Sequence, residues 1–476
     1  MSFQRWCFLI AALVYLTAAW FGVGYHAEDE FQQVILFAEH LRGHVDLASL
    51  PLDYHAHWRS MVQPLICAGV FETCNAISIT DPFQLTLVLR LLTAMLALRV
   101  THHFICRALP YLGQEHQHAF IVLSWFLWFL PVLQIRFTGE AWSGLLFLHG
   151  LGMLIASRER HSWLIGLCFG AAVALRPAAA FLPLGAVAWS VFVQRADRRR
   201  SMHIILGAGA AVLLAAVVDS FAYGEATSTL WNYAVAAISG EEADRFTTLP
   251  WYQHLLFAFK YATLPIGLLL ITAFVLLATL KPKHVLVWCV TPFLVVHSIM
   301  PVKELRFLFP LVPLMPWLLI SAWAELQHRW PMIMGRTFWL RLLFPFAVVN
   351  VLALIVGITT PAGNGRIKLA QAMRNRFEDQ AVHVDQLGDW RQWIPPFFLA
   401  PHSTEAFVDR IVIDPKSKPI HLVVAKQSSD LDRIDNMERL AVATPSWSHR
   451  FFRWYALDNG YDPLVLYQVH TQGSGH

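Results

Sequence analysis

The sequence predicts an all-α polytopic membrane protein with about eleven transmembrane helices and a small α/β domain at its C-terminal end. Of the 476 residues, 56% are hydrophobic and only 14% are charged, whereas soluble globular proteins carry about 25% charged residues. Apolar residues gather in runs of about 20, the length that a helix needs to cross the hydrocarbon core of a bilayer. Both observations indicate that lipid is the solvent for much of the chain.

The apolar runs define the expected spans. They cover residues 7–24, 82–106, 117–135, 140–157, 162–175, 177–194, 203–222, 256–280, 284–301, 306–323 and 338–359. The fifth and sixth runs meet at Arg176-Pro177, where the proline either ends a helix at a tight turn or breaks one helix in two. We expect the first run to be retained as a helix and not cleaved as a signal peptide, because further spans follow it.

The charge of the short loops predicts the orientation. With the N-terminus in the cytoplasm, most loop cations fall on the cytoplasmic side, as the positive-inside rule requires. They include Arg107, Arg195, Arg198, Arg199, Arg200, Lys281, Lys283 and Arg329. An odd number of spans then places the C-terminal tail outside.

These predictions divide the chain into two domains. Residues 1–359 form the transmembrane domain, with long external loops at about 25–80 and 223–255. Residues 360–476 form an extracytoplasmic soluble domain, in which the apolar run 420–425 is typical of a strand.

The first external loop has two further features. The pattern of residues 31–38 predicts an amphipathic helix lying in the membrane interface. Cys67 and Cys74 are both in this loop and could pair, but we expect buried free thiols.

Ionisable residues gather at the predicted external ends of the spans, where they tend to face water-filled cavities or partners. Glu28, Asp29 and Glu30 directly follow the first span, and one ionised carboxylate there can take a proton from an acceptor hydroxyl. A solvated acidic helix start explains this triplet equally well. The other external charged positions are His26, Arg59, Arg136, Arg176, Asp219, Lys303, Glu304 and Arg306.

The cations among them suit a phosphate group, because Arg binds it through a planar fork and Lys as a point charge. A lipid-phosphate donor needs such cations at the membrane edge to hold its head group. Arg136 and Glu140 lie four residues apart, so they could instead pair with each other on one helix face. The basic excess, a formal net charge of +4, does not point to nucleic acid, because no basic stripe or reader motif accompanies it.

Taken in order, these motifs resemble the lipid-phosphate-mannose mannosyltransferases of glycosyltransferase family 22, in the GT-C superfamily. The matching segments are His26-Ala27-Glu28-Asp29-Glu30-Phe31-Gln32, Arg59-Ser60, Arg90-Leu91-Leu92, Arg176-Pro177-Ala178-Ala179, Asp219 to Gly224, Pro250-Trp251-Tyr252 and Lys303 to Pro310. The chain departs from the family pattern at Ala27, where the family has Pro, and at Val302, where it has His. The Asp-Glu order of the family appears as Glu28-Asp29, and Ala222 stands where the family has Phe. Together, these departures bear on mannose specificity more than on the transferase class.

The resemblance implies a GT-C-like fold and inverting transfer of a sugar, expected to be mannose, from a polyprenyl- or dolichyl-phosphate carrier to a glycan or glycolipid. Asp29 would be the general base, with Glu28 and then Glu30 as alternatives. The donor phosphate would contact Lys303 and Arg306, with Arg176 as a further candidate.

The resemblance gives the remaining motif residues a substrate-binding or structural role. These are His26, Arg59, Arg136, Asp219, Tyr223, Trp251 and Glu304. Because protein cations can stabilise a leaving phosphate, we expect neither a metal ion nor another cofactor.

Three alternatives stay open. The protein could transfer another lipid-linked sugar, such as arabinose, glucose or an aminosugar. It could be a transporter or lipid flippase, although transporters favour internal repeats and sites near the midplane. It could also be a non-catalytic homologue whose tail binds a partner. We expect a bacterial inner membrane, with the endoplasmic reticulum as the alternative, and an active site on the extracytoplasmic face.

Overall fold

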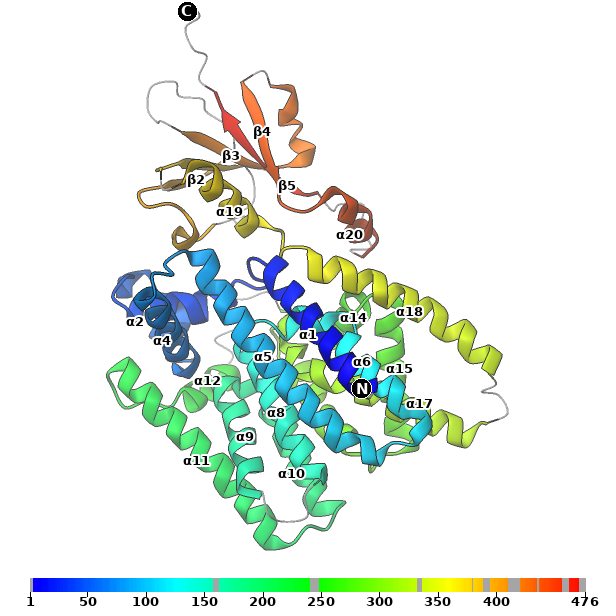
Figure 1. Cartoon of the computed structure of the whole chain (residues 1–476). Coiled ribbons are helices and arrows are strands. Elements are labelled where there is room, and N and C mark those ends of the chain that lie inside the picture. The colour runs from blue at the N-terminus through cyan, green and yellow to red at the C-terminus, as the bar shows by residue number, and fades with distance from the viewer. Residues whose placement is uncertain are drawn as a thin grey trace, which may run out of the picture.

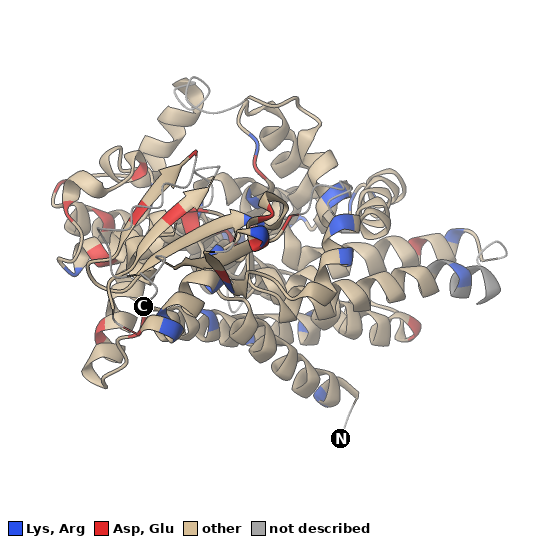
Figure 2. Ribbon diagram, turned by 90° about the horizontal axis from the view of Figure 1, so that it is seen from above, with Lys and Arg blue, Asp and Glu red and all other residues tan. Residues whose placement is uncertain are grey.

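The computed structural model describes residues 3–156, 162–239, 248–331, 336–378, 380–387, 394–409, 420–434, 436–455 and 462–470. Within these residues, long helices form one body, a layer of short helices lies beside one end of it, and a five-stranded sheet stands on that same end (Figure 1). Figure 2 shows that charged residues are sparse along the long helices, which are mostly tan.

Every predicted span falls on helix. The helices of the body are α1 (Phe3–Phe21), α5 (Pro82–Ala108), α6 (Gln114–Phe126), α7 (Phe129–Leu133), α8 (Gly139–Ala156), α9 (Ser162–Leu175), α10 (Phe181–Phe192), α11 (Arg198–Tyr223), α14 (Gln253–Tyr261), α15 (Leu264–Leu280), α16 (Val285–Ile299), α17 (Met315–Arg329) and α18 (Arg336–Thr359). Short η turns extend three of them: η3 (Leu109–Tyr111) follows α5, η4 (Pro177–Ala180) precedes α10, and η5 (Leu305–Leu314) precedes α17.

Not all of these helices are long enough to cross a bilayer alone. Among the described residues, six stretches have the length and composition of a span, and α15 with α16 forms a pair bent by 117° that could count as a seventh. The helices at 162–175, 177–192 and 343–359 are apolar but shorter. The protein is therefore an integral membrane protein.

Local chemistry sets several helix ends. Asp81 caps α5 by accepting hydrogen bonds from the backbone of Phe83 and Gln84, and Pro82 occupies the first helical position. At Arg176-Pro177, the proline ends α9 and the η4 turn leads into α10, so the tight-turn interpretation is the correct one.

Helices α9 and α11 pack closely because α9 presents glycines to the backbone of α11. A Cβ atom on Gly166 would lie 2.2 Å from the carbonyl oxygen of Ile204, and one on Gly170 would lie 2.2 Å from that of Ala208. Small residues spaced four apart let membrane helices approach in this way. The contact fixes α11, which carries Asp219.

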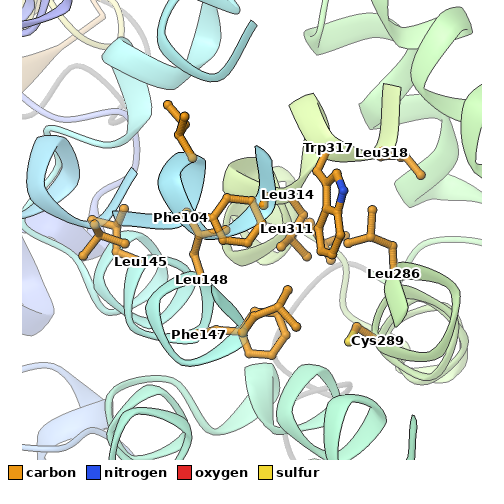
Figure 3. Packing of buried hydrophobic residues seen from close by; sticks show 14 of the residues in the cluster. Phe104, Leu145, Phe147, Leu148, Leu286, Cys289, Leu311, Leu314, Trp317 and Leu318 are labelled. Carbon is orange, nitrogen blue, oxygen red and sulfur yellow. The ribbon is translucent and has the colours of Figure 1, made fainter. Parts of the chain in front are cut away.

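The core of the body lies where α5, α8, α16, η5 and α17 meet (Figure 3). Phe104 of α5 meets Trp317 of α17 edge to face, with ring centroids 5.4 Å apart. Leu148, Leu286 and Leu314 are fully buried around them. This packing holds η5, and therefore Arg306, against α8.

The external layer consists of η1 (Phe31–Ile35), α2 (Leu36–Leu41), η2 (Leu47–Ser49), α3 (Leu52–His55), α4 (Val62–Ala76) and α12 (Thr229–Ser239). The predicted interfacial helix over 31–38 is therefore a π-helix that continues into α2. Its apolar side is buried in one cluster with Cys67 and Phe71 of α4, so it packs on protein rather than lying on lipid. Cys67 and Cys74 are both free.

The tail contains α19 (Arg366–Phe377), α20 (His449–Tyr455) and a sheet of order β2-β1-β3-β5-β4. Its strands are β1 (His383–Leu387), β2 (Thr404–Val408), β3 (His421–Lys426), β4 (Met437–Val442) and β5 (Leu464–Val469), with η turns at Pro396–Phe398, Gln427–Ser429, Leu431–Arg433 and Ser446–Ser448. β1 is parallel to β2 and β3, whereas β5 is antiparallel to β3 and β4. The predicted strand at 420–425 is β3.

The tail packs on the first external loop. Val23 and Tyr25 share one buried cluster with Ile367 and Leu369 of α19. The backbone N–H of Ala362 also donates to the carbonyl of Val23 at 2.9 Å. The start of the tail is thus held directly against the segment that carries the three acids.

Candidate active site

A cavity of about 660 Å³ opens between the first external loop and η5. Most of its wall is apolar and comes from α7, α14, α15, α16 and α17, with Phe129, Phe257 and Leu270 among the lining residues. The polar lining residues include His26, His254, Tyr261, Glu304 and Arg306. The cavity therefore has a hydrocarbon-like interior with charged groups on its wall.

The three predicted catalytic acids each meet an arginine from a different part of the chain. Glu28 pairs with Arg366 of α19, Asp29 with Arg306 of η5, and Glu30 with Arg136 of the α7–α8 loop. The acid triplet and the downstream Lys-Glu-Leu-Arg segment thus lie side by side, although Asp29 and Arg306 are 277 residues apart in sequence. Asp29 is the acid that contacts a cation of the cavity wall.

A polar network holds the Asp29 carboxylate in place. Asp29 pairs with Arg306 and accepts a hydrogen bond from the Gln33 side chain. Gln33 also donates to Asp53 at 2.6 Å, and Asp53 lies 3.7 Å from Arg59. Arg59, which the sequence assigned to binding or structure, therefore supports Asp29 through two intermediate side chains.

Glu30 holds the loop rather than facing the cavity. Its carboxylate accepts a hydrogen bond from the backbone N–H of His26 at 2.8 Å and lies 3.8 Å from Arg136, which donates to the carbonyl of Gly24 at 2.7 Å. Burial raises the pKa of the Glu30 carboxyl. His26, at the other end of this small turn, is a cavity-wall residue.

Arg136 and Glu140 do not pair with each other. Helix α8 begins at Gly139, so Arg136 lies before the helix and the four-residue spacing does not place the two side chains on one face. Arg136 turns to Glu30, while Glu140 lies 3.3 Å from Arg176. The Arg176 guanidinium also stacks over the Phe307 ring, 5.2 Å from its centroid.

The three predicted phosphate ligands have different surroundings. Arg306 lines the cavity and binds both carboxylate oxygens of Glu304, at 2.5 and 3.0 Å. The buried Lys303 ammonium donates to the carbonyls of Leu249, at 3.0 Å, and Met300. Within the part of the chain that the structure describes, Lys303 and Arg176 do not belong to the cavity wall.

Asp219 and Tyr223 fix the loop before α4. One carboxylate oxygen of Asp219 accepts hydrogen bonds from the Ser60 hydroxyl at 2.9 Å and the Met61 backbone at 2.7 Å, and the other accepts from Thr229 at 2.8 Å. The Tyr223 hydroxyl donates to the carbonyl of Arg59 at 2.7 Å. Their contacts are structural. Trp251 is 66% exposed and lies apart from this cluster.

Three residues of the candidate site were not predicted from the sequence: Arg366, Gln33 and His254. Arg366 lies 338 residues from Glu28, and no local pattern announces such a contact. Gln33 directly follows the motif that runs from His26 to Gln32. His254 is 2% exposed and lines the cavity; its position just after Trp251 and Tyr252 was the available signal.

The chain is similar to a known protein family and to solved structures. Residues 5–389 match the model of the Alg9-like mannosyltransferase family. The chain is similar to ArnT from Cupriavidus metallidurans bound to undecaprenyl phosphate, with 12% identity, a TM-score of 0.56 and coverage of 100% of both chains. Apo ArnT gives 14% identity, a TM-score of 0.50 and 97% coverage of both chains.

An oligosaccharyltransferase from Archaeoglobus fulgidus is also similar, with 12% identity and a TM-score of 0.48, covering 84% of this chain and 63% of that one. No curated protein matches the chain. The likeness to ArnT extends over the whole chain, tail included, and shows the GT-C fold. The protein is a glycosyltransferase, and it belongs to the Alg9-like mannosyltransferase family.

Proposed function

We propose that the protein transfers a mannosyl residue from a polyprenyl- or dolichyl-phosphate carrier to a glycan or glycolipid acceptor, with inversion, on the non-cytoplasmic face. The observation that carries this proposal is the Asp29–Arg306 pair at the apolar cavity. It puts a carboxylate that can accept a proton beside a cation that can hold a phosphate, next to space for a hydrocarbon chain.

The cavity suits a lipid-phosphate donor. Its apolar wall would bury part of the polyprenyl chain, while Arg306 would bind the phosphate through charge-assisted hydrogen bonds. The similar ArnT structure contains undecaprenyl phosphate, which supports a carrier of this class. Lys303 and Arg176 would act indirectly, since carbonyls bind the first and Glu140 the second.

The proposed reaction needs one base and one phosphate-binding cation. Asp29 accepts the proton of the acceptor hydroxyl while the hydroxyl oxygen forms a bond to the anomeric carbon. The bond from that carbon to the phosphate oxygen breaks, and its electron pair leaves with the lipid phosphate. Arg306 stabilises the negative charge that develops there. Attack opposite a β-linked phosphate gives an α-linked product.

The Asp29–Arg306 contact also makes donor binding and base activation dependent on each other. In the structure, Arg306 is engaged by Asp29 and Glu304. A donor phosphate would compete with Asp29 for the guanidinium and leave the carboxylate available to the acceptor. Gln33 would keep Asp29 in position during this exchange.

The three acids then have separate roles. Asp29 is the proposed base. Glu28 is the second candidate, but Arg366 engages its carboxylate from the tail. Glu30 positions the loop through Arg136 and the His26 backbone.

The proposed setting is a bacterial inner membrane with the active site outside. In Figure 1, the sheet and the short helices lie at the end of the body opposite the α10–α11 connection. Arg195 lies in this connection, and Arg198 to Arg200 begin α11. That separation agrees with a cytoplasmic cation-rich loop and an external site.

The test is a donor panel. Purified protein in lipid nanodiscs is incubated with an acceptor extract and polyprenyl phosphates carrying mannose, glucose, arabinose or an aminosugar. We expect transfer of mannose, an α-linkage by NMR, and a fall in turnover of about 10²- to 10⁴-fold in Asp29→Asn.

Glu28→Gln is the matched variant, since it changes the neighbouring acid while keeping its size. It removes only the charged contact with Arg366, so it should lose much less turnover than Asp29→Asn if Asp29 is the base. Transfer of another sugar in place of mannose would correct the donor, and near-normal turnover by Asp29→Asn would remove Asp29 as the base. Absence of transfer from every donor would contradict the proposal.

A further inference from the structure

Two histidines and an aspartate meet on one face of the tail sheet, away from the proposed active site. His383 and Asp385 lie two residues apart on β1, so their side chains leave the same face of the sheet. His421 opens β3 and is the register partner of His383 in the parallel pair. The strand register therefore brings the three side chains together without help from loop geometry.

The potential ligand atoms converge. Nε2 of His421 lies 2.6 Å from one carboxylate oxygen of Asp385, and Nε2 of His383 lies 3.0 Å from the other. The ligand atoms of all three residues lie within 4.8 Å of one another. Around a tetrahedral zinc ion with bonds of about 2.0–2.1 Å, neighbouring ligand atoms are about 3.3 Å apart. Small side-chain rotations would thus admit a cation between them.

One contact is compatible with a metal-binding tautomer of His383. Nδ1 of His383 lies 2.6 Å from the hydroxyl of Thr404, its register partner on β2. If the N–H of this nitrogen donates a hydrogen bond to the hydroxyl, the lone pair of Nε2 is left for a metal, and the ring orientation is fixed. The side chains are largely buried, with exposures of 14% for each histidine and 6% for Asp385.

We propose that the tail binds a divalent transition metal ion, best matched by Zn²⁺, through Nε2 of His383, Nε2 of His421 and the Asp385 carboxylate. Two imidazoles and one carboxylate are a ligand set that zinc accepts, and the fourth position is left for water. The ion would tie β1 to β3. This site departs from the sequence-based expectation that no metal binds, because His383 and His421 are 38 residues apart and come together only in the sheet.

The same contacts allow one other arrangement, in which Asp385 accepts a hydrogen bond from each imidazole and no metal binds. Full-length protein, purified in detergent through an affinity tag that contains no histidine, is stripped with chelator and titrated with Zn²⁺ and Co²⁺. Metal content is measured by mass spectrometry, and Co²⁺ coordination by visible absorption. We expect about one ion per chain and the intense absorption of four-coordinate cobalt.

Asp385→Asn and His421→Ala should lose the bound ion. The control is His470→Ala, because His470 also belongs to the tail and faces a carboxylate, Glu438, at 2.9 Å, but has no third ligand nearby among the described residues. Wild-type protein that takes up no Co²⁺ would overturn the proposal, and this result does not depend on whether the variants fold. Equal uptake by Asp385→Asn and the wild type would overturn it as well. Neither outcome bears on sugar transfer.

Discussion

Asp29 and Glu30 are neighbours in the chain, but their side chains have different partners. Asp29 contacts Arg306, a residue of the cavity wall, and so can exchange partners with a substrate. Glu30 is bound to the backbone of its own turn and to a buried arginine. A carboxylate held in this way stabilises the loop and is poorly placed to accept a proton from an acceptor.

The environment of Glu30 predicts a pH effect on stability. Burial raises the pKa of its carboxyl above the ordinary value of 4.5. The folded protein therefore holds this proton more tightly than the unfolded chain does. The resulting stability is fully present below pH 4.5 and is lost as the pH rises through the raised pKa.

Glu30→Gln removes this titration, and its amide oxygen can still accept the hydrogen bond from His26. The temperature of unfolding, followed by intrinsic fluorescence at a series of pH values, should therefore fall less steeply above pH 4.5 in the variant than in the wild type. Identical slopes for the two proteins would show that Glu30 does not control this range.

Single residues also show what the sequence could not provide. The position of Lys303 beside Arg306 was visible in the sequence, but which of the two faces the cavity depends on where the carbonyls of Leu249 and Met300 lie. The partner of Glu28 lies on α19, so it depends on how the tail docks. Motifs identified the segments of the site, while tertiary contacts decided each side chain's partner.

Among the elements, α9 and α11 show how close packing positions the site. The Gly166 backbone lies against Ile204 of α11 with no room for a side chain. The far end of α11 carries Asp219, which binds the backbone and side chain of the loop before α4. A change in the α9–α11 contact should therefore be felt in the external layer.

Gly166→Ala tests this contact. The added methyl group would overlap the Ile204 carbonyl oxygen, and such overpacking typically costs about 1–3 kcal/mol. We expect a lower temperature of unfolding in detergent. Gly209→Ala is the matched control, because a Cβ at that position of α11 meets no atom within 4 Å. Equal effects of the two substitutions would contradict the close approach.

The sequence predicts the helices and strands but not the contacts between them. Hydropathy placed each helix of the body because a lipid-facing helix must be apolar over most of its length. The same apolar runs could not show that α15 and α16 bend by 117° or that 31–38 packs on α4 instead of on lipid. Those features depend on shape complementarity between elements.

In the whole molecule, the tail contacts the loop of the proposed site. Arg366 pairs with Glu28 and stacks over the Tyr25 ring, 4.8 Å from its centroid. The tail thereby restrains the loop that carries Asp29. A mutation in the tail should accordingly change turnover without touching the cavity.

Arg366→Gln should lower the turnover number by roughly 10- to 100-fold, because small displacements of a catalytic group are costly. Arg374→Gln, two turns later on α19, is the control; among the described residues, Arg374 lies 3.8 Å from Asp81 and pairs with none of the three acids. Full activity of Arg366→Gln in a folded protein would indicate that the tail only covers the body.

The proposed mechanism requires that Asp29 and a donor phosphate compete for Arg306. The most direct test is the affinity of the purified protein for a polyprenyl phosphate without sugar, measured for the wild type, Arg306→Gln and Asp29→Asn. Loss of a charge-assisted contact predicts binding about 10- to 100-fold weaker in Arg306→Gln. Asp29→Asn should bind at least as tightly as the wild type, because its Arg306 is released. Equal affinity of all three proteins, or a loss in Asp29→Asn as large as that in Arg306→Gln, would contradict the account.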